Sequence, residues 1–176
     1  SIAGDKLRYT PAANWFGRDS FSYVMADSFG ATASAVVDLT VEAVNDAPAL
    51  AVIADAALAE GEVFSISAVG SDVDTGEVLT YALDAAPAGA TIDPATGAIR
   101  WTAIDGDAAY SFTVSVTDVA GLSASRSFQV NVANVAPTLA AGGLQAVYAG
   151  EAFTLELSSS DPGADTITTW RIDWGD

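Results

Sequence analysis

The sequence contains no cysteine and no histidine. Without cysteine the chain forms no disulfide, and no thiolate is present to bind zinc or to act in redox chemistry. Without histidine the commonest metal ligand and the most versatile acid or base near neutral pH are both missing. A metal site in this chain must therefore be built from oxygen ligands, and a catalytic site would depend on paired carboxylates.

Basic residues are scarce. Lysine and arginine total 6 against 23 aspartates and glutamates, which gives a net charge of -17 over 176 residues. Such a surface repels nucleic acid and anionic membranes, and it attracts cations. No apolar run reaches the length of a membrane-spanning helix, so we expect no membrane insertion. Half of the residues are nevertheless apolar, at 51%, and their regular alternation argues against a disordered acidic chain.

One motif occurs twice, 89 residues apart, as VNDAPAL at residues 44–50 and as ANVAPTL at residues 133–139. Each copy follows an alternating, strand-like run and contains a proline that fixes the backbone leaving it. This is the pattern of a joint between tandem modules. Asn45 and Asp46 would place side-chain oxygens at the seam, and a hard cation such as calcium prefers oxygen ligands. The same residues also fit an ordinary polar turn before a proline.

The repeat divides the chain into three parts: residues 1–46, 47–135 and 136–176. The middle part has the spacing of an immunoglobulin-like β-sandwich of seven short strands, whereas the outer parts correspond to the second and first halves of such a module. The clearest expected strands are Val63–Ser67, Val78–Leu83, Ala98–Thr102, Phe112–Val116 and Phe128–Val132. The fold class is therefore all-β, with one complete and two partial sandwiches. We expect the tryptophans to be buried.

The linker at residues 45–48, Asn-Asp-x-Pro, resembles that of bacterial cadherin-like repeats. The stretch IDPATGAIRW at residues 92–101 is similar to the signature of the dystroglycan-type subfamily, and WRIDWGD at residues 170–176 resembles a strand of polycystic-kidney-disease-type sandwiches. The resemblance implies tandem immunoglobulin-like sandwiches from a large surface adhesin, secreted or held at the bacterial cell surface.

Strand direction places the acidic residues. Consecutive strands of such a sandwich alternate in direction, so loops that follow every second strand meet at one pole. The pole beside the first linker collects Asn45, Asp46, Asp72, Asp74 and Asp118. The pole beside the second linker collects Glu60, Glu62, Asp105, Asp107 and Asn134, and the third part of the chain adds Asp161. Because like charges at one pole repel, we predict that calcium binds between them.

The cadherin resemblance implies similar roles for several of these acids. Asp72 and Asp74 look like the Asp-x-Asp element, Asp118 like the acid after the sixth strand, and Glu60 like the acid of the first-strand crossover. Asp105-Gly106-Asp107 stands where the family carries Asp-Arg-Glu, which is a looser match.

The two joints are not equal in sequence. Asp46 corresponds to Val135, and Asp74 corresponds to Gly163, whereas Asn134 and Asp161 are kept and Asp165 is a further acid nearby. The loss of two ligands predicts that the first joint binds calcium and that the second binds it more weakly or not at all.

These observations favour a spacer module that calcium turns into a rod, with neighbouring repeats as its partners. The complementary outer parts also allow head-to-tail pairing of copies into a fibre, or a window cut from a longer array. An alternative is a carbohydrate-binding module that uses exposed Trp15, Tyr110 or Trp174 on a surface polysaccharide. We do not expect an enzyme, because the carboxylates gather at module poles rather than in a cleft.

Overall fold

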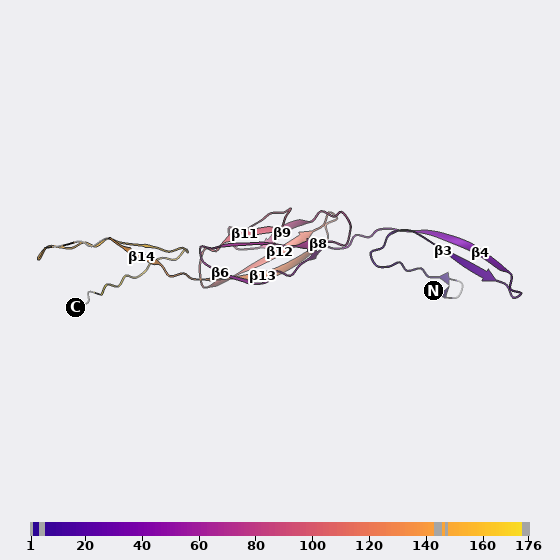
Figure 1. The fold of residues 1–176 in the computed structure, drawn as a ribbon, viewed down its shortest axis with the longest axis horizontal. Coiled ribbons are helices and arrows are strands. Elements are labelled where there is room, and N and C mark those ends of the chain that lie inside the picture. Colours follow the sequence, from indigo (N-terminus) through magenta and orange to yellow (C-terminus); the bar gives the residue numbers. More distant parts are fainter. Residues whose placement is uncertain (1, 4–5, 143–145, 147, 174–176) are drawn as a thin grey trace.

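A computed structural model describes residues 2–3, 6–142, 146 and 148–173 of the chain. Within these ranges the regular structure consists of strands, and no helix is present. The strands form three groups along an elongated molecule, and the largest group lies in the middle (Figure 1). The predicted fold class, all-β with one complete sandwich between two partial ones, is confirmed.

The middle group is the complete sandwich. Its strands are β5 (Ala49–Leu50), β6 (Ala56–Ala59), β7 (Val63–Ser67), β8 (Gly70–Ser71), β9 (Thr80–Ala85), β10 (Thr91–Ile92), β11 (Ala98–Thr102), β12 (Ala108–Thr117) and β13 (Ser123–Ala133). One sheet has the order β6-β13-β12-β9, a second has the order β10-β11-β7, and β5 pairs with β8. β6 runs parallel to β13, and the other pairs are antiparallel.

The strands predicted at residues 63–67 and 98–102 coincide with β7 and β11. The strand predicted at residues 78–83 begins two residues later, as β9, and β12 and β13 are longer than predicted. Sequence periodicity located these strands well because each has one face in the core and the other in solvent.

The core of the sandwich follows from this alternation. Phe112, Val114 and Val116 are fully buried on one face of β12, and Phe112 lies opposite Phe128 of β13 with ring centroids 5.0 Å apart. Burying each such side chain contributes roughly 1.5–3 kcal/mol to stability.

The second sheet closes the core from the other side. Phe64 of β7 lies 5.7 Å from Phe112, and Trp101 of β11 lies 5.6 Å from the same ring. Trp101 is 2% exposed, and its indole N–H donates to the carbonyl of Ala88 at 3.2 Å. The aromatic cluster thus ties β7, β11, β12 and β13 together.

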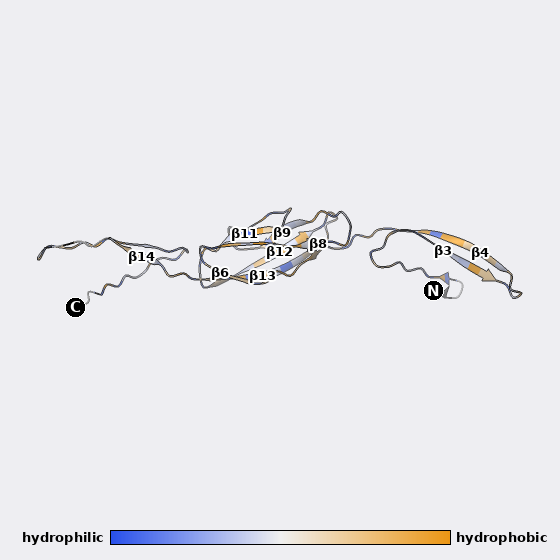
Figure 2. Cartoon of the chain, in the orientation of Figure 1, coloured by the Kyte–Doolittle hydropathy of each residue, from blue (hydrophilic) through white to orange (hydrophobic). Residues whose placement is uncertain are grey.

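The group on the N-terminal side contains β1 (Ile2–Ala3), β2 (Lys6–Leu7), β3 (Gly17–Ala26) and β4 (Thr32–Val41). β3 and β4 form a ten-pair hairpin like that of β12 and β13. The two turns match: Asp27 accepts from the Ala31 N–H, and Asp118 accepts from the Leu122 N–H. Figure 2 shows hydrophobic residues along β3 and β4. Several of them are exposed, including Val24, Met25 and Val36.

The group on the C-terminal side contains β14 (Thr138–Ala141) and β15 (Leu157–Ser160), which pair antiparallel. Residues 161–173 form no strand, so the strand predicted from the polycystic-kidney-disease-type resemblance is not seen over residues 170–173. Its last residues, 174–176, lie outside the described residues.

The tryptophans differ from expectation. Trp101 is buried as predicted, but Trp15 is 38% exposed and Trp170 is 46% exposed, and Trp174 lies outside the described residues. The expectation of burial was wrong for Trp15 and Trp170. Both belong to the outer groups, where the described residues form only two-stranded sheets with no second sheet packed over them as in the middle sandwich.

The aromatic cluster makes a stability prediction. Replacing Phe112 by alanine removes a ring that touches Phe64, Phe128 and Trp101, and we expect a loss of about 3–5 kcal/mol in the free energy of unfolding. Urea denaturation followed by tryptophan fluorescence measures it. Phe29→Ala is the matched control, because Phe29 is 97% exposed and should change stability by less than about 0.5 kcal/mol. Equal losses in both variants would contradict this account of the core.

Candidate metal centres at the two joints

Two clusters of oxygen-bearing side chains lie at the ends of the middle sandwich. The first-joint cluster, beside residues 42–48, consists of Asn45, Asp46, Asp72, Asp74 and Asp118. The second-joint cluster, beside residues 134–137, consists of Glu60, Asp105, Asp107, Asn134, Asp161 and Asp165. The sandwich core fixes the acids that lie in the loops of the middle sandwich, whereas Asp161 and Asp165 follow β15 of the next unit.

Hydrogen bonds connect the first-joint cluster. The Asn45 side-chain amide donates to Asp118 Oδ2 at 2.8 Å. The backbone N–H of Asp46 donates to Asp74 Oδ2 at 2.8 Å, and the backbone N–H of Asp74 donates to Asp72 Oδ1 at 2.9 Å. The five residues that strand direction predicted at this pole are therefore brought to the same pole. The other oxygen of Asp72, Oδ2, is buried without a hydrogen-bond partner.

Asp118 is the most enclosed acid of the first joint, at 6% exposed. The hydrogen bond from the Asn45 amide lowers the pKa of Asp118, and backbone N–H groups of residues 120–122 lower it further against partial desolvation. Asp118 thus stays ionised and fastens the linker to the loop between β12 and β13.

The second-joint cluster is built around Glu60, which lies in the turn between β6 and β7. Glu60 is 2% exposed, and its backbone N–H donates to the carbonyl of Ala133 at 3.0 Å. Glu60 Oε1 accepts from the Val135 N–H at 2.8 Å. Glu60 Oε2 is buried and has no hydrogen-bond partner. A buried carboxylate oxygen without a partner is costly unless a cation neutralises it.

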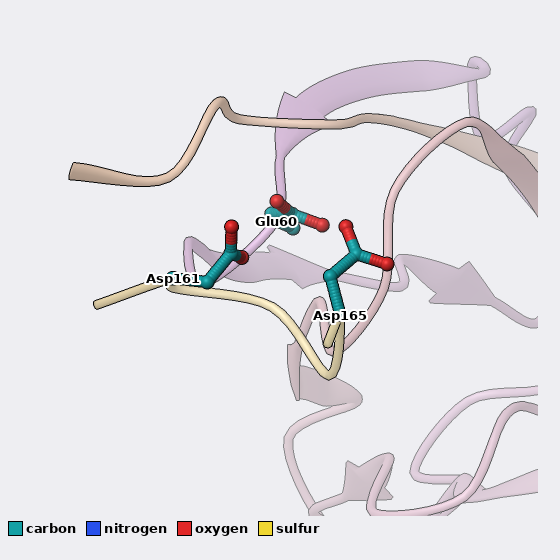
Figure 3. Close-up of side chains that lie close together, drawn as sticks. All are labelled: Glu60, Asp161 and Asp165. Atoms are coloured by element: carbon teal, nitrogen blue, oxygen red, sulfur yellow. The ribbon is translucent and has the colours of Figure 1, made fainter. Parts of the chain in front are cut away.

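Two acids of the next unit face this carboxylate. Asp161 and Asp165 follow β15, and one oxygen from each lies within 4.8 Å of the others and of an oxygen of Glu60. Figure 3 shows the three carboxylates turned toward one another. Three negative charges at this separation repel one another, and a divalent cation between them would reverse the sign of the interaction.

The remaining acids surround this group. Partial desolvation raises the pKa of Asp165, and the negative charges of Asp105, Glu60, Asp161 and Asp107 raise it further. The backbone N–H of Asn134 donates to Asp107 Oδ1 at 3.4 Å. Glu60, Asp105, Asp107 and Asn134 therefore lie around Asp161 and Asp165. Glu62, predicted at the same pole, is exposed, and its carboxylate accepts from the Ala59 N–H instead.

The Asn134 side chain can serve the cluster in two ways. With its nitrogen toward the acids it donates to Asp165 Oδ2 at 2.7 Å and to Glu60 Oε1 at 3.1 Å. A half turn of the amide presents Oδ1 instead, which is the atom that a cation would need. The site therefore fits calcium, which takes six to eight oxygen ligands from carboxylates, amides and carbonyls.

Gly163 corresponds to Asp74 of the first joint and carries no side-chain ligand, as the sequence indicates. Both loops keep the same turn, since the N–H of Gly163 donates to Asp161 Oδ1 at 3.0 Å as Asp74 does to Asp72. A Cβ atom at position 163, however, would overlap the Glu60 carboxylate. Glycine is therefore what lets Glu60 reach the loop of the next unit, and only a contact between distant segments could show it.

The aromatic residues proposed for sugar binding are dispersed. Tyr110 packs on Trp101 with centroids 4.8 Å apart, and Trp174 lies outside the described residues. Trp15 lines a cavity of about 230 Å³ with Phe16, Asp46 and Asp74. The described residues therefore present one of the three proposed aromatics beside a cavity, not a flat aromatic platform. No helix in the described ranges is long and apolar enough to span a bilayer.

Comparison with known families identifies the modules. Residues 47–133 match the model of a putative Ig domain, and residues 1–40 match that of a bacterial Ig domain. These families are immunoglobulin-like domains rather than enzyme families. No curated protein matches the chain.

Solved cadherin structures share the fold. Protocadherin Gamma B2 extracellular cadherin domains 3–6 are 20% identical, with a TM-score of 0.52 over 73% of this chain and 37% of that one. The human CDH23 EC21–23 structure is 16% identical, with a TM-score of 0.53 over 85% of this chain and 55% of that one. The protocadherin GammaB4 extracellular domain is 17% identical, with a TM-score of 0.52 over 85% of this chain and 27% of that one. The chain thus spans roughly a quarter to a half of the length of these proteins.

The first joint makes a pH prediction. The hydrogen bond from Asn45 lowers the pKa of Asp118. It therefore stabilises the folded state at pH values above the ordinary pKa of aspartate, and this stabilisation is lost as the pH falls through the lowered pKa. Asn45→Ala should move the pKa of Asp118 back toward its ordinary value. Carboxyl-carbon NMR titration measures this. Asp93 is the internal control, because backbone N–H groups of Thr96 and Ala95 lower its pKa, and its titration should not move. An unchanged Asp118 titration would show that Asn45 does not lower the pKa of Asp118.

Proposed function

From a chain built of bacterial immunoglobulin-like repeats with the cadherin-like sandwich fold, we propose a calcium-stiffened spacer module of an extracellular or surface-exposed repeat protein. The observation that carries the proposal is the Glu60 carboxylate, which is buried with one oxygen unpartnered and faces Asp161 and Asp165 of the next unit. No catalytic arrangement is needed for such a role. The partners are the neighbouring repeats of the same protein.

Calcium would be held by oxygens alone. At the second joint the ligands would come from Glu60, Asp161, Asp165 and Asn134, with Asp105 and Asp107 close by. The cation supplies positive charge between carboxylates that otherwise repel one another. Magnesium suits the cluster less well, since it keeps several waters and demands strict octahedral geometry.

The geometry favours the second joint over the first as the stronger site, which reverses the order that the sequence predicted. At the first joint, hydrogen bonds from Asn45 and the Asp46 N–H already occupy Asp118 and Asp74. Each joint has one buried carboxylate oxygen without a partner, Asp72 Oδ2 at the first and Glu60 Oε2 at the second. Among the described residues, however, three carboxylates converge within 4.8 Å only at the second joint. Calcium titration of Asp72→Ala and Asp161→Ala shows which joint binds calcium more tightly. If the second joint does, Asp161→Ala should lose more calcium affinity than Asp72→Ala. Head-to-tail pairing of copies stays a prediction from the sequence.

Calcium should raise the thermal midpoint of the chain. For an extracellular-type affinity of about 0.1–1 mM, 10 mM calcium stabilises by about 1.4–2.7 kcal/mol, because the cation binds the folded state alone. Calorimetry in chelator and in calcium measures the shift. A midpoint that does not move with calcium would contradict the proposal.

Glu60 should be required for that response. Glu60→Gln removes the buried charge but keeps its shape, so we expect a higher midpoint in chelator and a weaker response to calcium. Glu62→Gln is the matched control. Glu62 is an exposed neighbour in the same turn, and its carboxylate accepts a hydrogen bond from the Ala59 N–H. Isothermal titration of both variants compares their affinities, and an unaltered affinity in Glu60→Gln would remove Glu60 from the site.

A further inference from the structure

The two linkers leave the middle sandwich at opposite ends (Figure 1). The first linker leads into β5 and β6, and the second linker follows β13. Tension along the chain therefore enters the sandwich through its first two strands and leaves it through its last strand. In a spacer that is stretched between its neighbours, the bonds of these strands decide when the sandwich opens.

β6 and β13 run parallel, with residues 56–59 opposite residues 130–133. Tension pulls the beginning of β6 toward the first linker and the end of β13 toward the second linker. Because the strands are parallel, these two forces slide one strand along the other, and the hydrogen bonds of the ladder must stretch together. In an antiparallel pair the same two ends would lie side by side, and the bonds would open one at a time.

β6 is held less firmly than β13. β13 pairs with β12 at ten positions, whereas β6 pairs with β13 at four. Three of the four residues of β6 are alanines, so little apolar area holds this strand to the core. β5 adds two ladder pairs with β8 and a hydrogen bond from the Ala51 N–H to the carbonyl of Val69 at 2.9 Å. The β6–β13 ladder is therefore the longer of the two ladders that hold the first strands against tension.

Two acidic side chains extend this short ladder beyond the ends of β6. Asp55 precedes β6, and its Oδ1 accepts from the Gln129 N–H at 2.7 Å. Glu60 follows β6. Its N–H donates to the carbonyl of Ala133 at 3.0 Å, and its Oε1 accepts from the Val135 N–H at 2.8 Å. Hydrogen bonds to a carboxylate are shorter and stronger than those between neutral groups, so the ladder has a strong bond at each end.

We propose that β6 and β13 form a mechanical clamp. In this clamp the parallel ladder resists tension between the two linkers, and the carboxylates of Asp55 and Glu60 secure its ends. The sandwich opens when β6 slides along β13, and it opens more easily under tension in another direction. The inference rests on the proposed function, in which the module is held between its neighbours, and it adds the strands that resist the tension. Asp55 lies outside both joint clusters, so its part in the clamp can be tested apart from calcium.

The direction of pulling tests the clamp. The chain contains no cysteine, so engineered cysteines attach it to optical tweezers at chosen points. The pair Ala47→Cys and Ala136→Cys, the linker pair, pulls the beginning of β6 against the end of β13. The pair Ala47→Cys and Ala120→Cys, the turn pair, pulls the beginnings of both strands, because Ala120 lies in the turn before β13. All three alanines are exposed.

Both pairs are compared on the full chain, in chelator and at equal force. We expect the linker pair to unfold at least about tenfold more slowly than the turn pair, since several hydrogen bonds must break in one step. Equal rates, or faster unfolding of the linker pair, overturn the clamp.

Asp55→Ala should unfold about tenfold faster in the linker pair, because the clamp loses a hydrogen bond to a charged group. Asp55→Asn keeps an acceptor oxygen and should restore part of the resistance. Asp84→Ala is the matched control. Asp84 is also an exposed acid, and it accepts from the Ser115 hydroxyl at 2.8 Å, but it lies on β9 at the opposite edge of the same sheet. Its loss should leave the rate nearly unchanged.

The turn pair shows whether Asp55 acts in the clamp or only stabilises the fold. Asp55→Ala should accelerate the turn pair less than the linker pair, since the bonds there open one at a time. Equal acceleration in both pairs removes Asp55 from the clamp. Circular dichroism checks that the variants keep their fold. Should Asp55→Ala fail to fold, the two pulling directions with Asp55 in place still decide whether the clamp exists.

The outcomes separate the clamp from the proposed function. If both directions give equal rates while calcium still raises the thermal midpoint, the clamp fails and the proposed function stands. If the linker pair resists better and the midpoint does not respond to calcium, the clamp stands and stiffening by calcium fails.

Discussion

Packing between the two sheets of the middle sandwich decides where everything else in that module lies. Phe112 sits at the centre of this packing, against Phe64 of the opposite sheet and Phe128 of its own. Once these faces are pressed together, strand lengths and directions are fixed, and each loop must emerge at one pole or the other. The acids sit in those loops. The aromatic core therefore sets the position of charged groups that it does not touch.

The segregation of charge is the electrostatic counterpart of that packing. A chain with a net charge of -17 could spread its carboxylates evenly to lower their mutual repulsion. Here many of them meet at two poles, and one of them, Glu60, is almost completely buried. Without a cation, the resulting repulsion destabilises the folded chain. When a cation binds between the carboxylates, the same negative charges attract it and give the site its affinity. The same arrangement at both ends of a module is what an array of such modules needs.

Repetition with small differences gives the two joints separate properties. The loops around Asp72 and Asp161 share one turn geometry, yet one joint is closed by direct hydrogen bonds and the other brings together acids from two units. One exchange separates the two loops: Asp74 in the first corresponds to Gly163 in the second. This exchange does not change the strands, because positions 74 and 163 both lie outside them.

The sequence alone determined the fold class, most strand positions and the pole at which each acid lies. Alternation of apolar and polar residues is a local property, and strand direction follows from counting strands. Which carboxylates touch across a joint was decided by the tertiary structure. The approach of Glu60 to Gly163, 103 positions along the chain, depends on how two units dock, and aligned positions cannot report it. An alignment counts glycine as the loss of a ligand. The structure shows that, because Gly163 has no side chain, the Glu60 carboxylate of the neighbouring module fits against it.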